Sequence, residues 1–302
     1  MGRCPEGAEG VKKPKQQLNF QKTMNIQFLG TGAAEGIPAL FCNCNFCRSV
    51  RLRGGKAVRS RAQVLMDGEL SIDFPPDAFY HGLGAGVDLS AVRYLLITHS
   101  HCDHFYAHDF VLRGYKYAKN MTSPALHILG NADVLNVFYE SVRREMRPEV
   151  ENTFSFTCLK AFSPVSFGDW TAHPLKAMHS SSEPFVFFIE GKGKRILHLT
   201  DTGPLPEESY DYLQGLGGAP CDLVTLDCTF LYDDAPHSAR HMGVRENAEL
   251  LRRLREMGLV DGHTKAVITH FSHNSEPTEE KLRRAEGELN VTAAYDGLTI
   301  SI

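Results

Sequence analysis

The sequence predicts a mixed α/β fold in which two mixed β-sheets pack together and helices cover the outside. Short aliphatic and β-branched runs recur along the chain, and each has the length of a buried strand. Amphipathic stretches between them predict the helices. After residue 24 no Pro-, Gly- or Ser-rich linker divides the chain, and no repeat of about 20–50 residues is present. We therefore expect one domain over residues 24–302.

Composition narrows the class of protein. The 302 residues are 42% hydrophobic and 23% charged, which allows a full core without cross-links. The net charge of −4 gives no indication of nucleic-acid binding, and no apolar run reaches the ~18 residues of a membrane span. Residues 1–23 are polar and lack the apolar centre of a secretory signal, so we expect a disordered leader on a cytoplasmic protein.

The predicted strands are bounded by turn residues. In chain order they are 24–30, 62–73, 92–98, 126–130, 185–191, 194–201, 222–229, 265–271 and 293–302. Asp67-Gly68 and Asp296-Gly297 each predict a hairpin turn within their run.

Three helices are predicted, at 108–120, 245–258 and 276–289. The second has the clearest pattern, because Leu250, Leu251, Leu254 and Met257 form one apolar stripe that Gly258 ends.

Four metal-binding side chains follow one apolar run directly. The stretch "LLITHSHCDHF" carries His99, His101, Asp103 and His104 within six residues. His99 and His101 point the same way from an extended backbone, and the next two follow where the chain turns. Imidazole and carboxylate suit zinc and neighbouring divalent metals, and two close ligand pairs can serve two ions. Cys102 fills a place between the ligands.

This motif resembles the signature of the metallo-β-lactamase superfamily, whose fold is an αββα sandwich. Further matching segments are "LSIDF", "PLKAMHSS", "LHLTDTG" and "VITHFSH", which supply Asp73, His179, Asp201 and His270. The resemblance implies that His99, His101 and His179 hold one metal, that Asp103, His104 and His270 hold another, and that Asp201 bridges them. It also implies that Asp73 braces the metal-binding loop, and that the two ions are zinc or manganese.

A cysteine cluster predicts a further metal. Cys42, Cys44 and Cys47 form C-x-C-x-x-C, and a tetrahedral zinc would need a fourth ligand. His273, three residues after His270, is our candidate, and we expect this zinc to be structural. The pattern resembles the phosphoribosyl 1,2-cyclic phosphate phosphodiesterases of the carbon–phosphorus lyase pathway. By that resemblance the substrate is a small or cyclic phosphodiester.

The leaving group in such a reaction needs a proton, and His237 and His241 are the candidates. We prefer His241 as the catalytic donor, beside Asp103 as a ligand with a catalytic role. Asp227, at another strand end, is either a support for the site or an ordinary structural carboxylate.

A basic stretch has two interpretations. Residues 48–63 hold six basic residues and no acidic one, which is typical of a solvated face. Alternatively Arg59, Arg61 and the more distant Arg113 bind substrate phosphate.

Other functions stay open. The alternatives are a tRNA 3′-processing endonuclease, a lactonase or a thioesterase of the same fold, and a zinc-binding protein without catalysis. We expect a small-molecule substrate and neither nucleic acid nor membrane as a partner, with a homodimer as one option for assembly.

Overall fold

The computed structural model describes residues 23–84, 86–233 and 240–302. Two seven-stranded mixed sheets confirm the predicted fold class. The first sheet has the order β14 (Leu298–Ser301), β1 (Asn25–Gly30), β2 (Gln63–Met66), β3 (Leu70–Ile72), β4 (Tyr94–Leu96), β5 (Leu126–Gly130), β6 (Phe154–Cys158). The second has the order β13 (Thr292–Ala293), β12 (Lys265–Thr269), β11 (Leu223–Asp227), β10 (Lys194–Leu199), β9 (Phe185–Gly191), β8 (Trp170–Lys176), β7 (Val165–Phe167).

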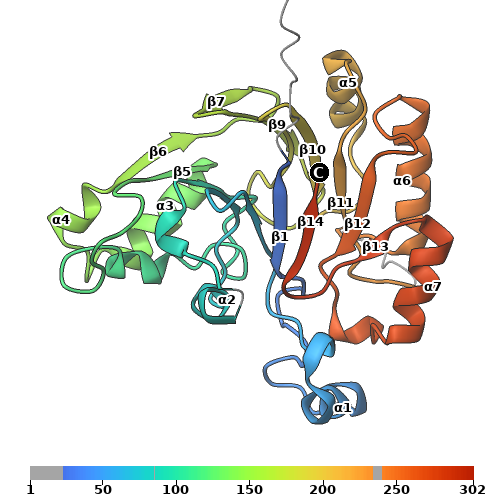
Figure 1. The fold of residues 1–302 in the computed structure, drawn as a ribbon, viewed down its shortest axis with the longest axis horizontal. Helices are drawn as coiled ribbons and strands as arrows, with labels where there is room; N and C mark the ends of the chain where they lie inside the picture. Colours follow the sequence, from blue (N-terminus) through green and yellow to red (C-terminus); the bar gives the residue numbers. More distant parts are fainter. Residues whose placement is uncertain (1–22, 85, 234–239) are drawn as a thin grey trace, which may run out of the picture.

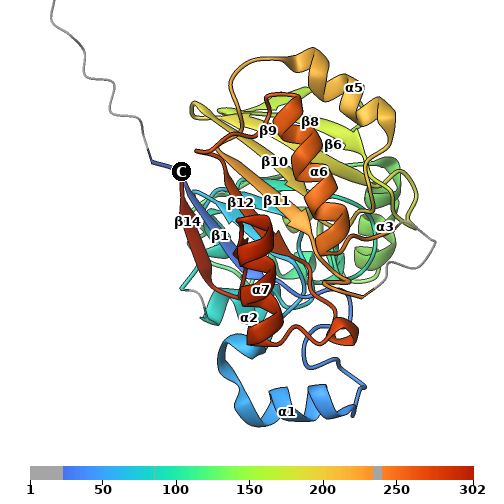
Figure 2. The ribbon, with the colours of Figure 1, turned by 90° about the vertical axis from the view of Figure 1, so that its right-hand side faces the viewer.

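Helices lie on the outer faces of both sheets (Figures 1 and 2). The α-helices are α1 (Asn45–Arg53), α2 (Ala78–Gly84), α3 (Ala132–Val142), α4 (Pro148–Glu151), α5 (Glu207–Leu216), α6 (Val244–Glu256) and α7 (Glu279–Leu289). Short 3₁₀ segments are η1 (Gly55–Ala57), η2 (Leu89–Ala91), η3 (Ala107–Leu112) and η4 (His273–Ser275). Helices α5, α6 and α7 cover the second sheet, whereas α1 projects from the body at one end.

Buried apolar side chains form three layers of the core. One fills the space between the sheets, around Phe28, Trp170 and Phe187. A second lies between the second sheet and its helices, where α6 buries Leu250, Leu251 and Leu254. The third lies between the first sheet and α3 with η3. Strands β10, β11 and β12 run parallel with both faces covered, which explains their continuous apolar sequence.

Two predictions of local structure need correction. The helix predicted at 108–120 is only η3, because Gly114 (φ 128°) and Tyr115 (φ 53°) end the helical geometry. Asp67-Gly68 makes the predicted hairpin between β2 and β3. The turn at Asp296-Gly297 does not make a hairpin, because it carries the chain from β13 in the second sheet to β14 in the first.

Candidate metal centre

The ends of strands from both sheets supply the polar side chains of one buried cluster. His99 to His104 follow β4, His179 follows β8, and Asp201 and His270 follow β10 and β12. Asp73, Asp201 and His270 all have positive φ, at 63°, 60° and 62°. Non-glycine residues seldom adopt this conformation, and it is found where a site needs a side chain aimed in a particular direction. The strand ends are therefore bent to point these side chains inward.

The predicted ligands form two groups that share Asp201. His99, His101, His179 and Asp201 offer atoms within 4.8 Å of one another, and so do Asp103, His104, Asp201 and His270. Asp201 Oδ2 lies 3.2 Å from His99 Nε2 and 3.1 Å from His104 Nε2, whereas its Oδ1 lies 3.3 Å from His179 Nδ1. The structure thus brings together all seven predicted ligands, in the two sets that the sequence resemblance implies.

The donor atoms of the cluster fit divalent metal ions. His104 Nε2, His270 Nε2 and Asp201 Oδ1 are buried and lack a hydrogen-bond partner. Buried polar atoms without partners are costly, and groups of nitrogen and carboxylate donors facing one point satisfy a cation. Two ions in these two sets would remove that cost.

Charges within the cluster strongly shift the pKa values of its side chains. Burial alone would raise the pKa of Asp201, but His270 and His104 hold it well below the usual value. Burial would also lower the pKa of His104, but the carboxylates of Asp103 and Asp73 raise it well above the usual value. A metal ligand must be a neutral imidazole, so ion binding at neutral pH is expected to displace a proton.

Asp73 supports the cluster from outside. Its carboxylate accepts hydrogen bonds from His104 Nδ1 (2.6 Å) and from the backbone N–H and hydroxyl of Thr98 (2.8 and 2.9 Å). Holding Nδ1 leaves His104 Nε2 to face the ligand cluster, which is how carboxylates orient metal-binding histidines. The structure therefore places Asp73 where the sequence predicted a brace.

His241 lies at the edge of the cluster. Its Nδ1 is 3.1 Å from both Asp227 Oδ2 and Asp201 Oδ1, and its ring stacks on that of His270. Burial lowers the pKa of His241, but Asp227 and Asp201 outweigh this effect and raise it to about 10. The other candidate donor, His237, lies outside the described residues.

Asp227 holds this edge together. It is fully buried, accepts from Met242 N–H (3.0 Å), and lies 3.4 Å from His270 Nδ1. Thr229 is a residue that sequence reasoning missed: its hydroxyl donates to His270 O and lies 2.9 Å from His270 Nδ1. Its position two residues after Asp227 could have indicated it, but threonine alone is too common to be a signal.

A second cluster joins the start of α1 and the residues just before it to η4. Cys42, Cys44, Cys47 and His273 offer atoms within 4.8 Å of one another, with Cys47 Sγ 3.4 Å from His273 Nδ1. Three sulfurs and one imidazole are a donor set for tetrahedral zinc. The Cys47 backbone N–H and His273 lower the pKa of Cys44 to about 6, whereas burial raises the pKa of Cys47 to about 11. His273 is thus placed as the predicted fourth ligand.

The predicted phosphate-binding arginines all contact acceptors within the protein. Arg59 is buried and donates to Thr31 Oγ1 (2.8 Å) and to Ala294 O. Arg61 pairs with Asp77 (3.0 Å). Arg113 donates to Ser123 O (2.7 Å), beyond the outer face of the first sheet. Each guanidinium thus has at least one acceptor within the protein, and a phosphate-binding role for these arginines stays a prediction.

Similarity to known proteins covers most of the chain. A model described as the β-lactamase superfamily domain matches residues 74–271. Among curated proteins, an octanoyltransferase of Porphyromonas gingivalis (strain ATCC BAA-308 / W83) is 25% identical over 284 residues. The match covers 91% of this chain, which spans about half (51%) of that relative.

Solved structures share the fold at low sequence identity. A diphosphatase from the PhnP family has a TM-score of 0.71 at 20% identity, covering 93% of this chain and 98% of the other. The metallo-β-lactamase fold protein YhfI from Bacillus subtilis has a TM-score of 0.63 at 18% identity, covering 93% and 100%. The short form of human tRNase Z has a TM-score of 0.62 at 18% identity, covering 92% and 99%.

No helix among the described residues has the length and apolar character to cross a bilayer.

The family model covers well over half of the chain, and the matched region contains the strand-end cluster of histidines and aspartates. The protein belongs to the metallo-β-lactamase superfamily, and its buried His/Asp cluster is that of a metal-dependent hydrolase.

Proposed function

We propose that the protein is a dinuclear-metal phosphodiesterase that acts on a small or cyclic phosphodiester. One observation carries the proposal: two ligand sets share Asp201, and a histidine held by a second carboxylate lies beside them. Two divalent ions bound there supply a hydroxide nucleophile at neutral pH and positive charge for phosphoryl oxygens. The residues around them then have to orient the substrate and move protons.

His241 is suited to protonate the leaving alkoxide. Asp227 pairs with its Nδ1 at 3.1 Å, which leaves Nε2 as the nitrogen that can face a leaving group. The carboxylates of Asp227 and Asp201 also favour the protonated imidazole, the form that can donate. About a fifth of this side chain is exposed, so a substrate can reach it.

The names of two solved structures that share the fold support phosphoester chemistry. The diphosphatase from the PhnP family and human tRNase Z are named for reactions at phosphorus. The C-x-C-x-x-C cluster with His273 and the segment around His241 resemble those of the phosphoribosyl cyclic phosphodiesterases. They therefore favour a cyclic phosphodiester as the substrate. A phosphoribosyl cyclic phosphate is accordingly our leading substrate.

A thioester or ester hydrolase is the second candidate. The similarity to half of a protein named octanoyltransferase favours it, because that name describes transfer of an acyl group. The same metal cluster could direct hydroxide to an acyl carbon.

A substrate panel on the metal-loaded protein separates these functions. Bis-p-nitrophenyl phosphate, 2′,3′-cyclic nucleotides and phosphoribosyl 1,2-cyclic phosphate test the first, and octanoyl thioester and a lactone test the second. Asp201→Asn serves as the blank for contaminating enzymes. We expect turnover of phosphodiesters that Asp201→Asn abolishes. Acyl hydrolysis without phosphodiester hydrolysis would replace the first function by the second, and turnover of neither would indicate a zinc-binding protein without catalysis.

A further inference from the structure

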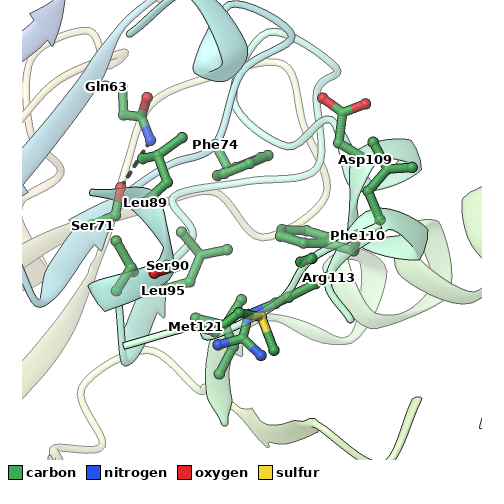
Figure 3. Close-up of a pocket in the computed structure, with 14 residues that line it drawn as sticks. Gln63, Ser71, Phe74, Leu89, Ser90, Leu95, Asp109, Phe110, Arg113 and Met121 are labelled. Carbon is green, nitrogen blue, oxygen red and sulfur yellow. Dashed lines mark hydrogen bonds between the residues drawn. The ribbon is translucent and has the colours of Figure 1, made fainter. Parts of the chain in front are cut away.

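A cavity of about 210 Å³ lies on the outer face of the first sheet (Figure 3). It is bounded by β3, β4, η2, η3 and the loop that follows η3. Its walls are mainly aliphatic and aromatic, including Phe74, Leu89, Leu95, Phe110 and Met121. None of the metal ligands lines it, so it is separate from the metal centre.

Two polar residues of the cavity wall, Gln63 and Ser71, already have hydrogen-bond partners. Gln63 Nε2 donates to Ser71 Oγ (3.0 Å) and to Asp73 O (3.2 Å), and the Ser71 hydroxyl donates to the same carbonyl (3.0 Å). Gln63 Oε1 is also paired, with His81 Nδ1 at 2.6 Å. A cavity that offers few free hydrogen bonds holds water poorly and favours an apolar occupant.

The volume limits the size of that occupant. An apolar cavity of about 150 Å³ in another protein holds benzene, and one water-sized group takes about 30 Å³. A cavity of 210 Å³ therefore has room for about seven groups of that size, which corresponds to a medium-length alkyl chain.

Charged side chains lie at two places on the cavity wall. Arg113 and Asp109 both belong to the lining, and Figure 3 labels both side chains. Two of the guanidinium nitrogens donate to Ser123 O and Pro124 O. A guanidinium has five N–H groups, so further donors remain for an anion. Among the described residues no ion pair joins Arg113 to Asp109 or to another acid.

We propose that this cavity binds a medium-chain carboxylate, with the alkyl chain between Phe74, Leu95 and Phe110 and the carboxylate on Arg113. The mainly apolar wall, the volume and Arg113 as the cation of the lining together favour this ligand class. The proposal does not depend on the reaction at the metal centre. Phe74 connects the two regions, because its backbone N–H donates to His104 O (2.7 Å) while its side chain lines the cavity.

Isothermal titration calorimetry of the metal-loaded protein with octanoate tests the proposal. We expect saturable binding of one octanoate per chain and tighter binding than of the uncharged octanamide. Ala118→Phe should weaken octanoate binding at least tenfold, because it places a ring in the cavity. Lys116→Phe adds the same ring at an exposed position on the same loop outside the lining, and should bind octanoate as the unmodified chain does. Arg113→Gln should weaken octanoate binding about tenfold and remove the preference over octanamide.

Carboxylates also bind metals, so Asp201→Asn is included. Octanoate should bind this variant with unchanged affinity, whereas loss of binding would place the ligand at the metal centre and overturn the proposal. Absence of saturable binding at millimolar octanoate, or unchanged binding to a folded Ala118→Phe variant, would also overturn it. Thermal melting of each variant confirms folding, and dodecanoate, which exceeds the volume, should bind more weakly than octanoate.

Discussion

The two clusters of metal-binding side chains differ in how the fold builds them. The His/Asp cluster lies at the ends of strands from both sheets, and most of its members are buried. The Cys/His cluster lies at the start of α1 and in η4, and only Cys47 of its four members is buried. The first offers two predicted donor sets that share Asp201, with a further possible set of Asp201, Asp227, His241 and His270 beside them, whereas the second offers one set of four donors. Catalytic zinc sites keep one coordination position for water or substrate, whereas structural zinc sites fill all four positions with protein ligands.

The largest expected effect comes from the shared ligand of the His/Asp cluster. Asp201→Asn removes the carboxylate that both ligand sets share, so phosphodiester hydrolysis should fall by about a thousandfold or more. Steady-state rates with bis-p-nitrophenyl phosphate measure this. Cys102→Ser is the control, because Cys102 is exposed between the ligands and should change neither rate nor metal content. Equal rates in Asp201→Asn and the unmodified protein would exclude this cluster as the active site.

The next effect concerns the proton donor. His241→Gln should lower turnover of substrates with alkoxide leaving groups by about a hundredfold, because general acid catalysis contributes at least that much. Substrates that release p-nitrophenolate need little protonation and should change far less. An equal loss for both kinds of substrate would mean that His241 acts on the metals or on folding instead.

Loss of the support that Asp73 gives to the cluster should have a smaller effect. Asp73→Asn keeps the shape of the side chain but removes the charge that His104 and Thr98 contact. Metal affinity should fall about 10- to 100-fold, as competition with a chromophoric chelator would show. An affinity within twofold of the unmodified protein would leave Asp73 as a turn residue only.

Loss of the Cys/His cluster should affect stability more than catalysis. Cys47→Ser should lower Tm by about 5 °C or more, because a metal that joins distant segments stabilises the folded state. The rate per catalytic metal pair should stay within about threefold. Cys158→Ser, an exposed cysteine outside both clusters, is the matched control. Complete loss of activity in a folded Cys47→Ser protein would contradict a structural role.

The smallest effect is a difference in reactivity within the Cys/His cluster. After chelation of the metal, Cys44 should be alkylated by iodoacetamide near neutral pH, because its pKa is lowered to about 6 by the Cys47 N–H and by His273. Alkylation of Cys44 should slow as pH falls through about 6, where the thiolate is protonated. Cys47 should react slowly, since burial raises its pKa to about 11. Peptide mapping by mass spectrometry measures both, and equal rates would contradict the different environments.

The sequence predicted those parts of the molecule that a local run of residue types is enough to identify. His99, His101, Asp103 and His104 stand in a dense motif after an apolar run, and the structure brings them together with the later strand ends. The hairpin at Asp67-Gly68 was also predictable, because its two strands pair with each other.

Other features depend on tertiary contacts that no local pattern shows. Asp296 accepts hydrogen bonds from Thr31 Oγ1 (2.7 Å) and Ser60 N–H (2.6 Å), and this holds a turn between two sheets in place of a hairpin. The buried position of Arg59 follows from acceptors that lie far away in the sequence. The cavity behind Phe74 arises from the packing of η3 and its loop, which the sequence had indicated as a helix.

Metal content, measured by inductively coupled plasma mass spectrometry on matched variants, tests the comparison most directly. Two catalytic ions and one structural zinc predict about three metal ions per chain in the unmodified protein. Cys47→Ser should lose one of them, and Asp201→Asn should lose the other two while keeping zinc. One metal ion per chain in the unmodified protein, or three in Asp201→Asn, would contradict the division of the two clusters into a dinuclear reactive centre and a structural site.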